Sequence, residues 1–306
     1  MALTEKTKNW LLKNSVSSFN NKCVLITGAT SGIGLKSAEI VLYLKAHIIM
    51  ACRNVQKANS IKENLLKEYP DAIIDIISLD LSDFSSIDTF VKEIKDRHID
   101  IDVFLNNAGV FHQPDKLTKD GLELVLGTNY FGVYYLTEKI LSYLNSLPHK
   151  VLYINTVSII CKIATVDYED FFCLRKYNNF KIYGRSKLCL AKYTLKKSKE
   201  YANSNIRIFL SHPGISITPL GVNAFGKTVG ILANALSHIF NSPEKSSLSL
   251  PLIMSKDFSV GSLIGPSKIF GGWGYPKLNR IPKRVKTGAD QLITFTENTL
   301  KNIKGR

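Results

Sequence analysis

Short apolar runs alternate with helix-length stretches along most of this chain, and the alternation constrains the fold more than any other feature of the sequence. The runs are rich in β-branched residues, and the stretches between them are amphipathic. Such alternation is typical of βαβ units, in which helices cover both faces of a parallel sheet. It therefore predicts an α/β protein with a doubly wound parallel sheet. The runs predicted to form buried strands are 23–27, 47–51, 72–78, 101–105, 151–155 and 206–211.

Domain organisation follows from the lack of any linker-like stretch in the sequence. Residues 22–306 are predicted to form a single domain, and residues 1–21 a helical extension that packs on it. After residue 211 the alternation of strands and helices ends, and a segment at about 215–250 is predicted to act as a substrate lid. The other predictions for this part are an apolar helix at 229–240, a loop at 242–251, a last strand at 259–264 and a closing helix at 289–304.

The formal net charge of +15 raises the question of an acidic partner. Basic side chains concentrate at 181–200 and 277–306, where they are predicted to lie on helical faces or loops rather than in one dense block. The sequence contains no recognisable nucleic-acid motif of the helix-turn-helix, zinc-finger or aromatic-strand type. It therefore predicts a solvated, Lys-rich surface and no nucleic-acid partner, with weak contact to a membrane surface as the alternative.

The cysteines and the apolar runs bear on metal binding and location. The five cysteines are an odd number and form no C-x-x-C pair, which predicts reduced, mostly buried thiols and argues against a zinc site or a disulfide framework. No run of 18 or more apolar residues occurs, and residues 1–20 lack the features of a signal peptide. We therefore expect a cytoplasmic protein without a metal.

A glycine-rich turn directly follows the first predicted strand and opens the first long helix, 32–44. Glycines at this place allow a tight turn and the close approach of a pyrophosphate to backbone N–H groups at the positive end of the helix. A glycine pattern alone is a weak signal, but its position in a βαβ unit predicts a dinucleotide-binding Rossmann fold. The turn residues predicted to bind the cofactor are Gly28, Thr30, Ser31, Gly32, Ile33 and Gly34.

The end of the second predicted strand decides which dinucleotide fits. An acidic residue there would accept hydrogen bonds from a ribose 2′-hydroxyl, whereas an arginine pairs with a 2′-phosphate. The run here ends in Arg53-Asn54 and contains no acid. We therefore predict NADP(H) in preference to NAD(H), with Arg53 and Asn54 in contact with it. The alternative is that Arg53 merely caps the strand at the surface.

Tyr183 and Lys187 lie four residues apart, which places them on one face of a helix. An ammonium beside a phenol is expected to lower the pKa of the phenol and to make it a proton donor and acceptor. Spacing alone does not single out this pair, since three others repeat it: Tyr135/Lys139, Tyr177/Lys181 and Tyr193/Lys197.

Several motifs in a fixed order show that residues 22–218 resemble the short-chain dehydrogenase/reductase family. In chain order they are the turn T-G-x-x-x-G-x-G from Thr27, Asp80-Leu81, Asn106-Asn107-Ala108-Gly109, Asn129, Ser158, Tyr183 with Lys187, and Pro213-Gly214 with Thr218. This order also selects among the four pairs. Tyr135/Lys139 precedes the serine, Tyr193/Lys197 faces elsewhere on the helix, and two asparagines interrupt Tyr177/Lys181.

The resemblance implies hydride transfer between NADP(H) and a carbonyl or alcohol group. Tyr183 would exchange the proton, Ser158 would orient the substrate oxygen, Lys187 would lower the tyrosine pKa and hold the nicotinamide ribose, and Asn129 would position a water. Further residues that the resemblance implies for cofactor binding are Asp80, Leu81, Asn107, Ala108, Gly109, Pro213, Gly214 and Thr218. A non-catalytic NADP-binding regulatory protein on the same fold is the alternative.

The 25-residue gap from Ser158 to Tyr183 is similar to that of the retinol dehydrogenase branch and related carbonyl reductases, which implies a retinoid-, steroid- or xenobiotic-like substrate. Val157 replaces the serine that is typical of the branch before Ser158. Substrate recognition is expected from the 159–180 insertion and from the apolar lid, and a homodimer could pair through the helices around Asn129 and Tyr183. His112 and His212 are predicted to be ordinary loop histidines. The apolar lid residues are Phe225, Val229, Ile231, Leu232, Leu236 and Phe240.

Overall fold

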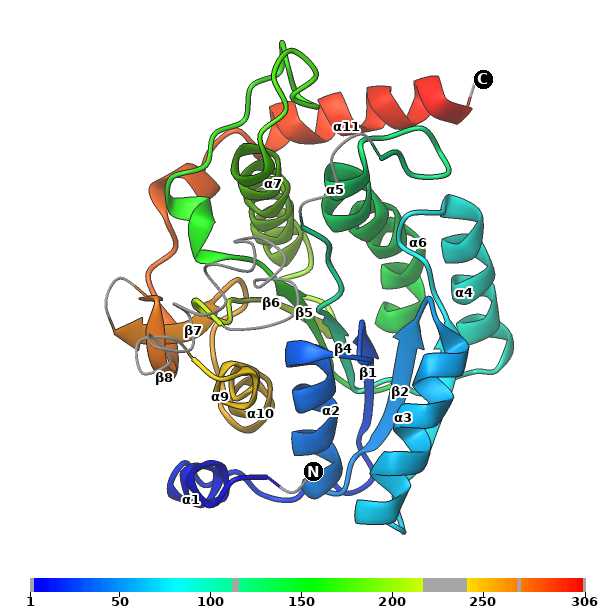
Figure 1. Ribbon diagram of the computed structural model, residues 1–306, viewed down its shortest axis with the longest axis vertical. Helices are drawn as coiled ribbons and strands as arrows, with labels where there is room; N and C mark the ends of the chain where they lie inside the picture. Colours follow the sequence, from blue (N-terminus) through cyan, green and yellow to red (C-terminus); the bar gives the residue numbers. More distant parts are fainter. Residues whose placement is uncertain (1–2, 112–115, 217–240, 269–270, 305–306) are drawn as a thin grey trace, which may run out of the picture.

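The computed structural model describes residues 3–111, 116–216, 241–268 and 271–304. Its strands form an eight-stranded sheet in the order β3-β2-β1-β4-β5-β6-β7-β8 (Figure 1). All neighbouring pairs are parallel except the last, β7 with β8. The predicted doubly wound sheet is therefore confirmed. The strands are β1 Cys23–Thr27, β2 His47–Cys52, β3 Ile74–Ser78, β4 Val103–Asn106, β5 Val151–Thr156, β6 Ile206–Ser211, β7 Leu263–Lys268 and β8 Trp273–Asn279.

Helices cover both faces of this sheet (Figure 1). Side chains that alternate along β1 enter two separate apolar cores, with Leu25 on one side and Val24 and Ile26 on the other. The first core is closed by α4, α6, α7 and α11, and the second by α1, α2, α3 and α10. The helices are α1 Glu5–Lys13, α2 Gly32–Tyr43, α3 Val55–Glu68, α4 Phe84–Asp96, α5 Leu124–Leu126, α6 Val133–Ser146, α7 Asn179–Glu200, α9 Pro243–Ser247, α10 Ser249–Ser255 and α11 Ala289–Lys304.

The amino-terminal helix α1 packs on the domain through its apolar face. Trp10 and Leu11 are buried in the second core, and the Trp10 ring stacks on Tyr275 of β8 at 5.8 Å between ring centroids. Thr4 caps α1 and also donates hydrogen bonds from its backbone N–H and its hydroxyl to Glu244, at 3.0 and 2.8 Å. The helix thus holds β8 and α9 together at one edge of the sheet.

The carboxyl-terminal part differs from the sequence-based predictions. The loop predicted at 242–251 is wrong, because Ser242 caps α9 and Pro243 occupies its first turn, where a missing N–H has no cost. The last parallel strand begins at Leu263 rather than at residue 259, since Gly261 adopts a left-handed conformation with φ +78°. Strand β8 was not predicted. The apolar helix predicted at 229–240 and most of the predicted lid lie outside the described residues.

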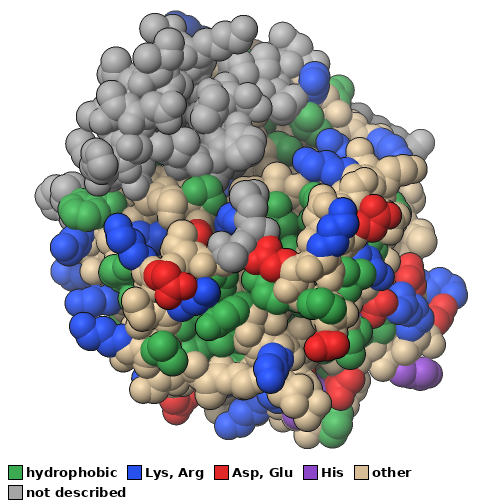
Figure 2. All heavy atoms as spheres, turned by 60° about the horizontal axis from the view of Figure 1, so that its bottom comes forward, with side chains coloured by type: hydrophobic (Ala, Val, Ile, Leu, Met, Phe, Trp, Pro, Cys, Tyr) green, Lys and Arg blue, Asp and Glu red, His purple; other side chains and the backbone are tan. Residues whose placement is uncertain are grey.

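The cysteines are buried, and the surface carries charges of both signs. All five cysteine side chains are buried, and burial raises the pKa of each thiol. Within the described ranges, no helix combines the length and apolarity needed to cross a bilayer. On the face shown in Figure 2, Lys and Arg side chains are interspersed with acidic and apolar ones.

Candidate active site

The order of the strands creates a crevice at the carboxyl ends of β1 and β4, where the connections leave in opposite directions. The loop after β4 is fastened to the end of β1 by Thr27. Its hydroxyl accepts hydrogen bonds from the backbone N–H groups of Asn107 and Ala108, both at 3.0 Å. Thr27 therefore sets the spacing of the two loops, a role that the sequence reasoning missed although this threonine opens the glycine motif.

The glycine-rich turn has no room for a side chain at two of its positions. Gly28 has φ +69°, and a Cβ atom added to it would lie 2.9 Å from the Cα of Ala108. A Cβ atom on Gly34 would lie 2.3 Å from the carbonyl oxygen of Gly28. At the start of α2, Ser31 provides no side-chain cap, so the first backbone N–H groups of this helix are left for a ligand. Thr30, Ser31, Gly32 and Ile33 form this partly exposed helix end.

Arg53 and Asn54 follow β2, and among the described residues only the side chain of Asn54 has a hydrogen-bond partner. Arg53 is exposed, and within the described residues it forms no hydrogen bond or ion pair. Asn54 caps α3, since its side-chain oxygen accepts a hydrogen bond from the Lys57 N–H at 2.8 Å. The guanidinium of Arg53 is therefore available to a ligand, whereas the side-chain oxygen of Asn54 already has a partner.

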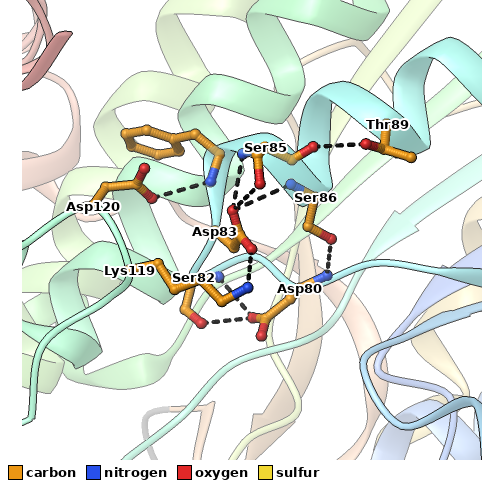
Figure 3. Close-up of polar contacts among 9 residues, drawn as sticks. Asp80, Ser82, Asp83, Ser85, Ser86, Thr89, Lys119 and Asp120 are labelled. Carbon is orange, nitrogen blue, oxygen red and sulfur yellow. Dashed lines mark hydrogen bonds and ion pairs between the residues drawn. The ribbon is translucent and has the colours of Figure 1, made fainter.

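Asp80 and Leu81 follow β3 in a tightly bonded turn (Figure 3). The Asp80 carboxylate accepts hydrogen bonds from the N–H and hydroxyl of Ser82, at 2.9 and 2.6 Å. The Asp80 N–H donates to the Ser86 hydroxyl at 2.9 Å. Leu81 is buried, and its carbonyl oxygen packs directly on Gly132, where a Cβ atom would approach it to 2.0 Å. The turn is thereby held before any cofactor binds.

Asp83 links this turn to the segment 116–123. Its carboxylate caps α4 by accepting from the Ser85 and Ser86 N–H groups, at 3.0 and 3.3 Å, and it pairs with Lys119 (Figure 3). Burial pushes the pKa of Asp83 up, but the hydrogen bonds from Lys119, Ser85 and Ser86 together outweigh it and lower the pKa from 3.8 to about 2. The neighbouring Asp120 accepts from the Phe84 N–H at 3.0 Å.

Asp83→Asn is expected to lower the free energy of unfolding at pH 7 by about 1–2 kcal/mol, after allowance for the solvent-exposed Lys119. Because folding lowers the pKa of Asp83, its carboxylate stabilises the fold above about pH 4, and this stabilisation is lost as the pH falls through about 2. Urea unfolding at pH 7 and pH 3 measures the difference, which should shrink at the lower pH. Asp120→Asn is the control, because burial raises the pKa of Asp120 and its charge is not stabilising.

Asn129 lies in a π-helical turn, Gly127–Gly132, between α5 and α6. Its side-chain oxygen accepts a hydrogen bond from the Val110 N–H at 2.7 Å. Its side-chain nitrogen donates to the Val110 carbonyl at 2.9 Å and to the Ser186 hydroxyl at 3.2 Å. The fully buried amide thus fastens the loop after β4 to α7. Ser186, which precedes Lys187, is a positioning contact that spacing alone did not reveal.

Ser158, Tyr183 and Lys187 meet beside Asn129. Ser158 follows β5, and its hydroxyl forms a hydrogen bond with that of Tyr183. The ammonium of Lys187 donates to the Thr156 carbonyl at 2.9 Å. A Cβ atom on Gly109 would lie 3.1 Å from the Asn129 side-chain oxygen and 3.5 Å from the Lys187 Nζ. Asn129 and Lys187 therefore approach the backbone at Gly109, and Ser158 is bonded to Tyr183 one helical turn before Lys187.

Burial dominates the electrostatics of these groups. It raises the pKa of Tyr183 to about 12, although the hydrogen bond from Ser158 opposes the shift. Burial also lowers the pKa of Lys187 from 10.5 to about 8. The expectation of a lowered tyrosine pKa is therefore wrong, because desolvation of the phenolate outweighs the hydrogen bond from Ser158. A phenol that keeps its proton is suited to donate it.

The other Tyr/Lys pairs are engaged elsewhere. The Tyr135 hydroxyl donates to Asp88, at 3.0 Å, and the Tyr193 hydroxyl to Glu138, at 2.7 Å. The Tyr177 hydroxyl donates to the buried Glu123 at 3.1 Å. Each of these three hydroxyls therefore has a carboxylate partner, whereas Tyr183 has a serine. This difference agrees with the choice of Tyr183 made from motif order.

The segment after β6 borders the same crevice. His212 is buried, and burial lowers its pKa to about 4, so its ring is neutral at pH 7 and accepts a hydrogen bond from the Gly214 N–H at 3.3 Å. Gly214, which follows Pro213, has φ +76°, and a Cβ atom there would lie 2.5 Å from the Gly272 carbonyl oxygen. Three groups of predicted residues lie outside the described residues: Thr218, His112 and the apolar lid side chains at 225–240.

A cavity of about 610 Å³ opens beside the insertion. Its walls come from three elements: the segment 116–123, the insertion residues Phe172 to Tyr177, and the end of α11. Apolar side chains, among them Leu117, Leu122 and Ile303, form most of the lining, and its size falls within the usual range for small-molecule sites. The insertion therefore borders a space of ligand size, and the lining of this space includes none of Asn129, Ser158, Tyr183 and Lys187.

Comparison with known proteins adds independent findings. Residues 22–227 match the family model described as short chain dehydrogenase. Mouse retinol dehydrogenase 14 is 33% identical over 213 residues, which cover 66% of this chain and 63% of that protein. Human retinol dehydrogenase 13 is 32% identical, with 68% and 62% covered. The chloroplastic short-chain dehydrogenase TIC 32 B of Brassica napus is 34% identical, with 64% of each covered. The chain thus spans somewhat less than two thirds of these relatives.

Solved structures show the same fold. An uncharacterised protein from Mycobacterium paratuberculosis matches with a TM-score of 0.73 and 26% identity, covering 93% of this chain and 95% of that one. L-Sorbose reductase from Gluconobacter frateurii, solved with NADPH and L-sorbose, has a TM-score of 0.64 at 20% identity and covers 80% and 95%. The second likeness concerns the fold alone.

Proposed function

The chain belongs to the short-chain dehydrogenase family, and on that premise we propose that it transfers a hydride between NADP(H) and a carbonyl or alcohol group of a small molecule. The observation that carries the proposal is the hydrogen bond between Ser158 and Tyr183, together with the approach of Lys187 and Asn129 to Gly109. These side chains supply a proton donor, an orienting hydroxyl and an ammonium within one crevice. Fold membership alone would not support chemistry.

In this proposal each side chain has a separate role in carbonyl reduction. Tyr183 donates its proton to the oxygen as negative charge develops there, and Ser158 holds that oxygen beside Tyr183. Lys187 stabilises the resulting phenolate and contacts the nicotinamide ribose, while Asn129 keeps the loop at Gly109 in register with α7. NADPH, when bound, supplies the hydride. The steps run in reverse for alcohol oxidation.

The residues around the crevice fit a dinucleotide. The uncapped start of α2 offers backbone N–H groups to a pyrophosphate, and the glycines allow its close approach. In this proposal Asp80 and Leu81 would contact the adenosine half, and the loop 107–109 with Pro213 and Gly214 would contact the rest of the cofactor, as the resemblance implies. Arg53, exposed at the end of β2, supports a preference for the 2′-phosphate of NADP(H).

Arg53→Asp is expected to shift the ratio of NADPH to NADH affinity by roughly 10- to 100-fold toward NADH, because the charge-assisted bonds to the phosphate are lost and repulsion replaces them. Dissociation constants from fluorescence titration with both cofactors measure the shift. Arg280→Asp, another exposed arginine, makes the same change in net charge and should leave the ratio within twofold. An unaltered ratio in Arg53→Asp would contradict the assignment of this residue.

A lipophilic carbonyl substrate is supported by relatives that bear the name retinol dehydrogenase. The deciding experiment is NADPH oxidation measured against a panel of aldehydes, ketones, retinoids, steroids and quinones. Turnover of at least one class is the expected result. Tight NADPH binding without oxidation across the whole panel would instead favour a non-catalytic NADP-binding regulator.

A further inference from the structure

Arg185 lies between Tyr183 and Lys187 in sequence but faces away from both. Two residues correspond to about 200° around a helix, so the side chain leaves the opposite side of α7. Its exposed fraction is 0%, and it is the largest of the fully buried side chains. A residue inside the catalytic motif thus carries its charge into the protein rather than into the crevice.

The partners of this guanidinium are backbone carbonyls of the insertion. Its Nε donates to Thr165 at 3.3 Å, and its Nη1 donates to Asp170 and Phe171, both at 2.5 Å. The guanidinium also lies 5.8 Å from the ring centroid of Phe171. No carboxylate of the described residues forms an ion pair with it, and its Nη2 has no hydrogen-bond partner among them. Burying a cation on these terms carries a substantial desolvation cost.

The insertion that Arg185 holds is also fixed from other sides. Arg284 donates to the carbonyls of Ile163 and Ala164, at 2.7 and 2.9 Å. The ring of Phe171 packs on Phe295 of α11, at 4.5 Å between centroids. Immediately after this pinned stretch, the residues from Phe172 to Tyr177 form one wall of the 610 Å³ cavity. The backbone at 165–171 therefore connects the catalytic helix to that wall.

We propose that Arg185 is a positioning residue, which fixes residues 165–171 on the catalytic helix and thereby holds the wall at 172–177 in place relative to Tyr183. The kinetic part of this inference rests on the proposed function. It also assigns the wall at 172–177 to substrate binding, whereas Ser158, Tyr183 and Lys187 are not part of the lining of that cavity. A displacement of about 1 Å in a substrate-positioning element is enough to cost roughly 100-fold in rate. A guanidinium suits the task because its planar donors reach several carbonyls at once, which a lysine does not do.

The test compares Arg185→Met with Arg207→Met. Arg207, on the interior strand β6, is the control: it too donates to a backbone carbonyl, that of Phe258, and lies 5.8 Å from a phenylalanine ring, but it also pairs with Asp257 at 2.5 Å. Arg185→Met is expected to raise KM for the carbonyl substrate at least tenfold while the dissociation constant for NADPH stays within twofold. Arg185→Lys should also raise KM without changing the NADPH dissociation constant. Arg207→Met should change neither quantity. An unaltered KM, or equal losses for substrate and cofactor, would overturn the proposal.

A second readout needs no turnover, so it separates failure of this inference from failure of the proposed function. Hydrogen exchange of a peptide covering 165–174 should be at least tenfold faster in Arg185→Met than in the unmodified protein. Exchange in α4 should be unchanged, which excludes general unfolding. Exchange at 165–174 that matches the unmodified protein would refute the anchoring whether or not any carbonyl is reduced.

Discussion

Tyr183→Phe is expected to lower kcat for carbonyl reduction by about 10²–10⁴-fold while leaving NADPH affinity within twofold. The substitution removes one hydroxyl and keeps the ring, which packs edge-on against Phe111 at 4.9 Å between centroids. The tyrosines of the three other Tyr/Lys pairs do not take over, because Tyr135, Tyr177 and Tyr193 are each bonded to a carboxylate. The loss therefore falls on proton donation and not on the shape of the crevice.

Stopped-flow or steady-state NADPH oxidation with a substrate found by the panel measures this loss, and fluorescence titration measures cofactor binding. Tyr135→Phe is the matched control, since it removes a hydroxyl of α6 that is bonded to Asp88 of α4, and kcat should stay within twofold. Retention of more than a tenth of kcat by Tyr183→Phe would remove this residue from the mechanism.

The fold was largely predictable because its strands are buried on both faces. Strands such as β1 and β5 must then be apolar almost throughout, and amphipathic helices must separate them. The same logic fails at β8, which contains Gly274 and Pro276. An edge strand tolerates both residues, since one side of it needs no ladder partner. A loop was predicted at 242–251, whereas Ser242 caps a helix there and Pro243 begins it.

Motif order selected Asn129, Ser158, Tyr183 and Lys187 as candidates, and their catalytic roles stay a prediction. Their electrostatics were not predictable from the sequence. The pKa of Tyr183 could not be read from its neighbours in sequence, because it depends on how completely the packed protein excludes water from the phenol. Arg185 was overlooked for the same reason: a charged residue on a helix is expected to be solvated, and only tertiary packing buries it.

Lys187→Met is expected to lower kcat/KM for carbonyl reduction by at least about 100-fold and to weaken NADPH binding, because it removes both the ammonium and the proposed ribose contact. The pH profile provides a sharper criterion. With the pKa of Lys187 lowered to about 8, kcat/KM for reduction should be level below about pH 8 and fall above it as the ammonium loses its proton. In Lys187→Met this fall should be absent. A profile unchanged by the substitution would assign the titration to another group.

The same substitution should not weaken the fold. Burial lowers the pKa of Lys187 from 10.5 to about 8, so the buried ammonium destabilises the folded protein by about 3 kcal/mol below pH 8. This cost fades as the pH rises from about 8 toward 10.5, where the unfolded chain also loses the charge. Methionine avoids it but leaves the Thr156 carbonyl without its donor, at about 1–2 kcal/mol. Urea unfolding at pH 7 should therefore show a free energy of unfolding about 1 kcal/mol higher, and a clear decrease would mean that Lys187 serves the fold rather than the reaction.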